Sequence, residues 1–149
     1  MTRYDWASLN HLQLGRYAEY FAMMEFTMYG FDVYRTEVDD RGIDFIIRKG
    51  VDQYYDVQVK SVRNFNYTFF PKHLFTPRKS LLAAVIIFIQ DQRPQLYLIP
   101  SVAWKNPDAL LVSRDYEGKK SKPEWGLNLS KKNRYLLDEY TFDQVVERL

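Results

Sequence analysis

Residues 42 to 60 read GIDFIIRKGVDQYYDVQVK, and they carry the clearest structural pattern in the chain. The apolar run from Ile43 to Arg48 and the alternating apolar and polar residues from Tyr54 to Lys60 each predict a β-strand. The glycine-containing segment Lys49 to Gln53 predicts the turn between them. We therefore expect an antiparallel β-hairpin at the centre of the molecule.

The hairpin has one polar face. If the turn spans Lys49 to Gln53, Arg48 pairs with Tyr54, and Asp44 then lies opposite Gln58. Residues two apart on a strand share a face, so Lys60 lies on the same side as Gln58. Directly opposed Cβ atoms lie about 4.5–5.5 Å apart. An acid, an amide and a lysine are therefore expected on one patch of the sheet.

Such a patch suits phosphodiester hydrolysis, which needs a bound cation and a fixed positive group. Asp44 can anchor the cation, and the Gln58 side-chain oxygen and the Val59 main-chain carbonyl can add neutral ligands. Lys60 can supply the positive charge. The alternative is a surface hairpin with an ordinary polar face, and the spacing alone does not separate the two interpretations.

Further elements are predicted on both sides of the hairpin. His11 to Tyr29 predicts a helix, which Asn10 and Gln13 cap and Gly30 ends. Its expected buried stripe comprises Leu14, Ala18, Phe21, Ala22 and Met28. The other predicted elements are strands at Phe31 to Thr36, Leu82 to Gln90, Gln95 to Ile99 and Trp125 to Leu129, a short helix within Pro71 to Lys79, and a terminal helix at Phe142 to Leu149.

Composition limits the classes of protein and of site. The chain has 149 residues, the size of one domain, and we expect residues 1–149 to form a single one. It contains no cysteine and two histidines, which excludes disulfides and thiolate sites and favours oxygen ligands for any metal, as Mg²⁺ or Mn²⁺ prefer. The polar N-terminus and the absence of a long apolar run predict a soluble, cytoplasmic protein with no membrane partner.

Four short motifs together resemble the PD-(D/E)XK nuclease superfamily. They are Gly15-x-x-x-Glu19 on the first helix, Gly30 at its end, Gly42-Ile43-Asp44, and Val57-Gln58-Val59-Lys60 on successive strands. The similarity covers roughly residues 13 to 63. It is to small single-domain members such as Holliday-junction resolvases, intron homing endonucleases and bacterial relatives.

The resemblance implies a restriction-endonuclease-like core, an α/β (α+β) fold in which α-β-β-β-α-β elements form a mixed sheet flanked by helices. It also implies a site in which Asp44 and Glu19 bind the metal and Lys60 is the motif lysine. Two departures stand out: Gln58 replaces the usual glutamate, and Ile43 replaces the usual proline. The first removes a negative charge, so we expect a second metal ion to bind more weakly.

Other acids compete with these assignments. Glu25 lies nearer the middle of the apolar stripe than Glu19 and is the rival helix acid. Glu37, Asp39 and Asp40 form an acidic cluster typical of a turn, although Asp39 or Glu37 could be an auxiliary metal ligand.

The segment after the hairpin is basic and aromatic. Between Val57 and Gln90 there is no acidic residue, and the DNA-binding candidates in this window are Arg63, Lys72, His73, Arg78 and Lys79. The aromatic residues Phe65, Tyr67 and Phe69 are interpreted as packing residues. A second basic run consists of Lys119 to Lys122 and Lys131 to Arg134, which flank the predicted Trp125 strand, and it is interpreted as solvated.

The sequence therefore predicts a divalent-metal-dependent endodeoxyribonuclease whose partner is DNA. One chain carries one site, so cutting both strands of a duplex predicts a homo-oligomer, a dimer or larger. Two alternatives stay open: a catalytically inactive nuclease fold that binds DNA or protein, and a structural or regulatory protein that self-assembles through aromatic surface.

Overall fold

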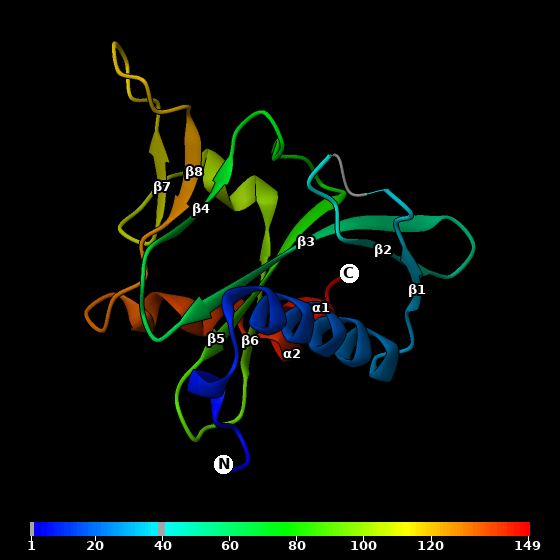
Figure 1. Cartoon of the computed structure of the whole chain (residues 1–149). Coiled ribbons are helices and arrows are strands. Elements are labelled where there is room, and N and C mark those ends of the chain that lie inside the picture. Colours follow the sequence, from blue (N-terminus) through cyan, green and yellow to red (C-terminus); the bar gives the residue numbers. More distant parts are fainter. Residues whose placement is uncertain (1, 39–40) are drawn as a thin grey trace.

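The hairpin forms as predicted and lies within a mixed five-stranded sheet. A computed structural model describes residues 2–38 and 41–149. The sheet order is β1-β2-β3-β5-β6. These strands span Asp32–Arg35 (β1), Phe45–Lys49 (β2), Gln53–Arg63 (β3), Leu81–Phe88 (β5) and Gln95–Pro100 (β6). All neighbouring pairs are antiparallel except β3 and β5, which are parallel (Figure 1).

The register of β2 and β3 is the predicted one, with Arg48 opposite Tyr54 and Phe45 opposite Val57. β3 is longer than expected and changes partners along its length. Its first residues pair with β2, whereas Asp56 to Arg63 pair with Leu81 to Phe88 of β5. From residue 58 onward, no strand in the described residues pairs with the edge of β3 that faced β2, and we call this the open edge.

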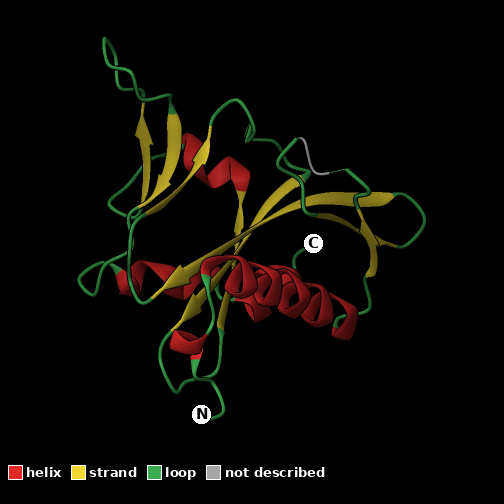
Figure 2. Cartoon of the chain, in the orientation of Figure 1, coloured by secondary structure: helices red, strands yellow, loops and turns green. Residues whose placement is uncertain are grey.

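Two helices cover one face of this sheet. α1 (His11–Met28) begins with the predicted capping box of Asn10 and Gln13, and α2 spans Phe142–Val146. Figure 2 shows both helices, in red, beside the strands of this sheet. They pack into one hydrophobic cluster with alternate residues of the strands, among them Val57 and Ala84. The α1 stripe differs from the prediction at its end, because Phe26 is buried while Met28 is 81% exposed.

A second, three-stranded sheet covers the other face. It has the order β4-β8-β7, from Thr68–Pro71 (β4), Glu124–Leu127 (β8) and Leu111–Arg114 (β7). Phe70, Leu111 and Leu127 of this sheet pack, together with Trp104, against the β5 residues that face away from α1, such as Val85. The 3₁₀ helices η2 (Ser101–Lys105) and η3 (Arg134–Tyr140) lie on the same side, and η1 (Trp6–Ser8) precedes α1.

The prediction of a short helix within Pro71 to Lys79 is wrong. The first residue of this segment ends β4, and the remainder is a turn followed by irregular chain. Pro71 and Pro77 lack the amide hydrogen that a helix needs. Because Phe70 pairs with Trp125 in the second sheet, the start of this segment forms a strand and not a helix. The predicted α+β architecture, a mixed sheet flanked by helices, is confirmed. No helix in residues 2–38 and 41–149 has the length and apolar character of a membrane span.

Candidate active site at the open edge of β3

A pocket of about 620 Å³ lies where β3 has lost its β2 neighbour. β3 contributes Val59, Lys60 and Ser61, and α1 contributes Glu19. The other lining residues are His11, Leu12, Gln13, Gly15, Arg16 and Thr68. The pocket is therefore bounded by the first half of α1, the open strand edge and the start of β4.

Glu19 and Lys60 approach this pocket from different faces of the sheet. α1 covers the face of Val57, whereas Lys60 is in register with Val85, which packs in the opposite cluster. The two side chains line one pocket because the strand edge between the faces is uncovered. Glu19 is partly exposed, and its carboxylate accepts a hydrogen bond from Arg16 at 3.3 Å. The rival acid Glu25 lines a different pocket.

Asp44 is tied to β3 just before β2 begins. Its Oδ2 accepts a hydrogen bond from the Val59 amide at 2.7 Å, and its own amide donates to the Val57 carbonyl at 2.9 Å. Thr36 adds a hydroxyl that donates to the main-chain carbonyls of Ile43 and Asp44. These bonds fix the carboxylate beside the residue that lines the pocket.

Lys60 is partly buried and lies close to two aromatic rings. Its Nζ lies 5.4 Å from the Phe70 ring centre and 5.9 Å from that of Phe69. Burial lowers the pKa of the Lys60 ammonium, and the nearby Asp44 charge acts in the opposite direction. The lysine and the aspartate are therefore electrostatically linked, as the predicted hairpin face requires.

Gln58 is buried behind this edge, with 8% of its surface exposed. Its Oε1 is a buried oxygen for which the described residues provide no hydrogen-bond partner. A side chain at position 42 would contact Leu74 and the Gln58 amide, so Gly42, with φ of +75°, lets the chain pass close to it. An unsatisfied buried carbonyl oxygen is costly unless a donor or a cation reaches it.

The donor set contains few charges. Within the described residues, no three His, Asp or Glu side chains form a metal-binding group. Asp39 and Asp40 of the predicted acidic cluster lie outside the described residues, and Glu37 lies on the segment that leads into them.

Of the predicted DNA-binding residues, three have hydrogen-bond or ion-pair partners within the described residues, and two are exposed. Arg63 donates to the carbonyls of Trp6 and Leu9 at 2.8 and 2.6 Å, so it fixes the segment before α1. Arg78 forms an ion pair with Asp56 at 2.7 Å. Lys72 bonds Asp115 and Ser113, each at 2.7 Å, and lies over Trp125. His73 and Lys79 are exposed, and the described residues offer neither an ion pair.

Sequence reasoning missed several pocket residues. Arg16 stands one turn before Glu19 and is more than half exposed at the pocket, and its position within Gly15-x-x-x-Glu19 was the available signal. Ser61 follows Lys60 directly on the open edge. Thr68 comes from the second sheet, and no local pattern connects it to the hairpin.

Comparison with known proteins identifies the fold. No protein-family model matches the chain, and no curated protein matches it. Among solved structures it is similar to Hjc, a Holliday junction resolvase from the archaeal hyperthermophile Archaeoglobus fulgidus. The TM-score is 0.54 at 12% sequence identity, and the alignment covers 89% of this chain and 95% of that chain. The chain therefore has a mixed α+β fold that matches the restriction-endonuclease-like fold of Hjc.

Proposed function

We propose that this protein is a divalent-metal-dependent endodeoxyribonuclease that hydrolyses DNA phosphodiester bonds at the open edge of β3. The observation that carries the proposal is the pocket shared by Glu19, Val59 and Lys60, with Asp44 hydrogen-bonded to the Val59 amide. This arrangement lies in a fold shared with a Holliday junction resolvase. Fold alone does not assign an activity, so the site supports the reaction class.

The side chains around the pocket fit a hard cation. Asp44 and Glu19 would provide carboxylate oxygens, and the Val59 carbonyl and Gln58 Oε1 would provide neutral ones. The unsatisfied, buried Gln58 oxygen is the feature of this structure that favours such a ligand. Mg²⁺ and Mn²⁺ accept oxygen donors of these kinds. When bound, the ion would supply an activated water and neutralise charge on the phosphate.

The chain's own groups would orient and stabilise the reacting phosphate. The hydrogen bond from the Val59 amide holds the Asp44 carboxylate in one orientation. Lys60 would place its ammonium beside the phosphate, in a partly buried position where charge–charge interactions are stronger than in water. Arg16 and Lys79 are exposed cations, and His73 is an exposed imidazole; all three would contact the DNA backbone.

A dimer is part of this proposal, because one chain carries one pocket and a duplex has two strands. α1 presents an exposed apolar stripe of Tyr20, Met24 and Met28 at helical spacing. Large exposed apolar stripes are typical of contact surfaces. A second copy is the occupant that the two-strand requirement favours. Sedimentation of the wild type and of a Met24→Glu variant tests it, and a wild type that is monomeric in the presence of DNA would contradict it.

Metal-dependent nicking of supercoiled plasmid tests the activity. Asp44→Asn and Lys60→Met should each reduce the nicking rate by roughly 100-fold or more, the usual cost of removing one preorganised electrostatic group. Asp52→Asn and Lys105→Met make the same chemical changes at exposed positions away from the pocket and should leave the rate unchanged. Thermal unfolding checks that each variant folds. Nicking by both pocket variants at the wild-type rate would refute the assignment.

A second candidate function is a binding module that has lost catalysis. It is favoured by Gln58 in place of a carboxylate and by the lack of a three-acid cluster in the described residues. Thermal stability during Mg²⁺ and Mn²⁺ titration separates the two, because a ligand that binds the folded state raises its stability. Unchanged stability at millimolar metal, with DNA binding but no cleavage, would favour the binding module.

A further inference from the structure

An exposed aromatic ring stands beside the candidate catalytic lysine. Phe69 on β4 is 43% exposed, whereas its neighbour Phe70 is fully buried in the core. The Phe69 ring centre lies 5.9 Å from the Nζ of Lys60, and Thr68 lines the same pocket as Lys60. The proposed nuclease site therefore has an apolar, solvent-accessible surface on its β4 side.

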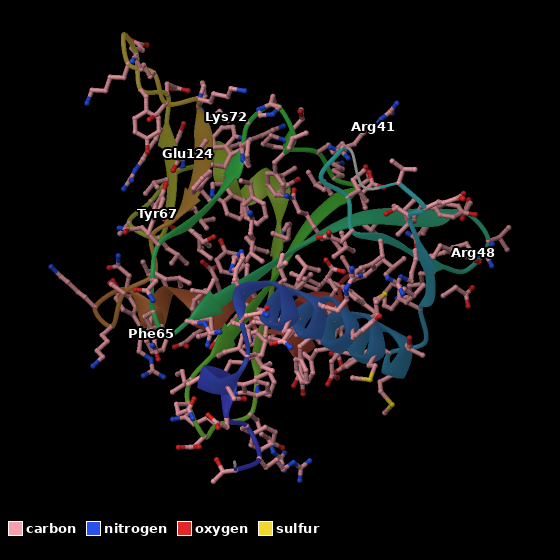
Figure 3. All side chains as sticks on the ribbon, viewed as in Figure 1. Arg41, Arg48, Phe65, Tyr67, Lys72 and Glu124 are labelled. Carbon is pink, nitrogen blue, oxygen red and sulfur yellow. The ribbon has the colours of Figure 1, made fainter. Side chains whose placement is uncertain are left out.

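Contacts within the second sheet hold this ring in place. The Tyr67 ring stacks against Phe69 at 6.4 Å and 27°, and the Arg114 guanidinium lies 4.2 Å from the centre of the Tyr67 ring. The Tyr67 hydroxyl donates a hydrogen bond to the buried carboxylate of Glu124. Burial and this carboxylate raise the pKa of Tyr67 well above its usual value, so the hydroxyl keeps its proton. Figure 3 shows Tyr67 and Glu124 on the same part of the second sheet.

Gly126 makes this arrangement sterically possible. It pairs with Phe69 on one side and with Val112 on the other. A Cβ at position 126 would lie 2.2 Å from the Tyr67 hydroxyl oxygen and 2.7 Å from a Val112 methyl. Tyr67 can cross β8 only because residue 126 has no side chain. Residues Tyr67, Phe69, Arg114, Glu124 and Gly126 thus form a preorganised unit, here called the aromatic platform.

Cationic groups border the platform. A cavity of about 310 Å³ next to it is lined by Phe69, Glu124, His73 and Lys122, with Pro71, Ser121 and Pro123. The loop between β7 and β8, the yellow segment that projects from the molecule in Figure 1, carries Lys119, Lys120 and Lys122. Glu124 bonds Tyr67 and Asp115 pairs with Lys72, so both of these acids are already engaged. The same loop also carries Glu117, but its three lysines leave these surroundings with an excess of positive charge, which complements an anionic ligand.

We propose that Phe69 is a stacking platform for an unpaired DNA base adjacent to the phosphate held at Lys60. The inference rests on the proposed function for the position of that phosphate. A base inside a duplex is covered on both faces by its neighbours, so only a single-stranded or extruded base can lie on the ring. The substrate class is therefore DNA with unpaired bases, with Phe69 as a specificity residue.

Binding measured in EDTA, where no cleavage occurs, tests the platform. The probes are a fluorescent single-stranded oligonucleotide and a fully paired duplex of the same sequence. Phe69→Leu keeps apolar bulk and removes the aromatic face, and Phe69→Trp restores it. Tyr135→Ala is the matched control, because Tyr135 is an exposed aromatic residue on η3. Base stacking on an aromatic residue predicts that Phe69→Leu weakens single-strand binding by roughly 5- to 100-fold.

The expected pattern is selective. Phe69→Leu should weaken duplex binding far less than single-strand binding, Phe69→Trp should bind the single strand like the wild type, and Tyr135→Ala should change neither. The stacking proposal would be overturned if Phe69→Leu weakened the binding of both probes equally or of neither, or changed only the sedimentation coefficient of the protein. A wild type that does not bind the single strand would overturn it as well. Because metal is absent, a protein that shows the selective pattern but never cleaves DNA would refute the nuclease activity and leave the platform standing.

Discussion

The first and the last residues of β3 both include polar side chains, but the elements that lie next to them differ. At its start, Gln53 to Val57 pair with β2. There Arg48 of β2 forms an ion pair with Asp32 at 3.0 Å and lies over the Tyr34 and Tyr54 rings. At its end, Gln58 to Arg63 pair with β5 and with no other strand of residues 2–38 and 41–149, and the opposite edge borders the pocket. In Figure 3, Arg48 lies far from the second sheet and its labelled Tyr67.

The difference shows what a neighbouring strand does to a polar side chain. Beside the paired strand, Arg48 donates through its terminal nitrogens to Asp32 and Tyr54, although its Nε is buried without a hydrogen-bond partner in the described residues. At the open edge, Gln58 retains an unsatisfied buried oxygen and Lys60 is held in a position that lowers its pKa. Perturbed groups of this kind are concentrated at functional sites.

The largest effect is expected at the last residue of β3. Arg63→Ala removes two charged hydrogen bonds to the carbonyls of Trp6 and Leu9, which should lower the free energy of unfolding by about 3 kcal/mol. DNA affinity should change little, because the guanidinium already serves the segment before α1. Chemical denaturation and DNA binding at a temperature where the variant is folded check both parts. An Arg63→Ala variant with full stability but weakened DNA binding would show that Arg63 contacts phosphate.

Gln58→Glu should strengthen metal binding at the open edge. The change replaces the unsatisfied oxygen with a carboxylate and adds a negative charge to the set of groups, Asp44 and Glu19, that we propose as metal ligands. We expect Mn²⁺ affinity, measured by calorimetry, to rise roughly tenfold, the lower end of the range for groups that support a metal site. Asp52→Asn, in the β2–β3 turn, is the control. Unchanged or weaker Mn²⁺ binding by Gln58→Glu would show that this side chain does not face the ion.

Lys60 makes stability depend on pH in a definite direction. Its folded-state pKa is lowered by burial, so in the window between that value and the ordinary lysine value near 10.4 the unfolded chain binds more protons. Stability of the wild type relative to Lys60→Met should therefore rise as pH rises through this window. Thermal midpoints of both proteins over alkaline pH measure it. A difference that stays constant or falls would mean that the ammonium is not buried.

The smallest effect is expected at the paired end of β3. Arg48→Ala removes an ion pair that is largely solvated, so thermal stability should fall slightly at low salt and be indistinguishable from the wild type at high salt. Plasmid nicking should not change. A large loss of nicking by Arg48→Ala would mean that the site extends along the whole strand.

The sequence predicted the hairpin and its polar face because both are local. Turn length and alternation of residues decide that Arg48 pairs with Tyr54, and the structure has that register. The helix cap at Asn10 and the end at Gly30 were likewise predictable from nearby residues. The position of Glu19 beside Lys60 depended on the family resemblance, since no local pattern joins a helix to a strand edge.

The second sheet was not predictable in the same way. Phe69 and Phe70 point to opposite faces of a four-residue strand, and their partners on β8 are more than 50 positions away in sequence. The partners of Arg63, Lys72 and Arg78 are also distant in sequence, so composition does not predict these contacts. Aromatic residues in this segment were therefore all interpreted as packing, although Phe69 is exposed.

The most direct test of the central claim is a crystal structure of the protein soaked with Mn²⁺, using anomalous scattering to locate the ion. We predict one ordered ion at the open edge of β3, ligated by Asp44 and bounded by Gln58 and Glu19, and its loss in Asp44→Asn. Ordered Mn²⁺ elsewhere, or none at a concentration that supports nicking, would contradict a metal-dependent site at the place where β3 leaves β2.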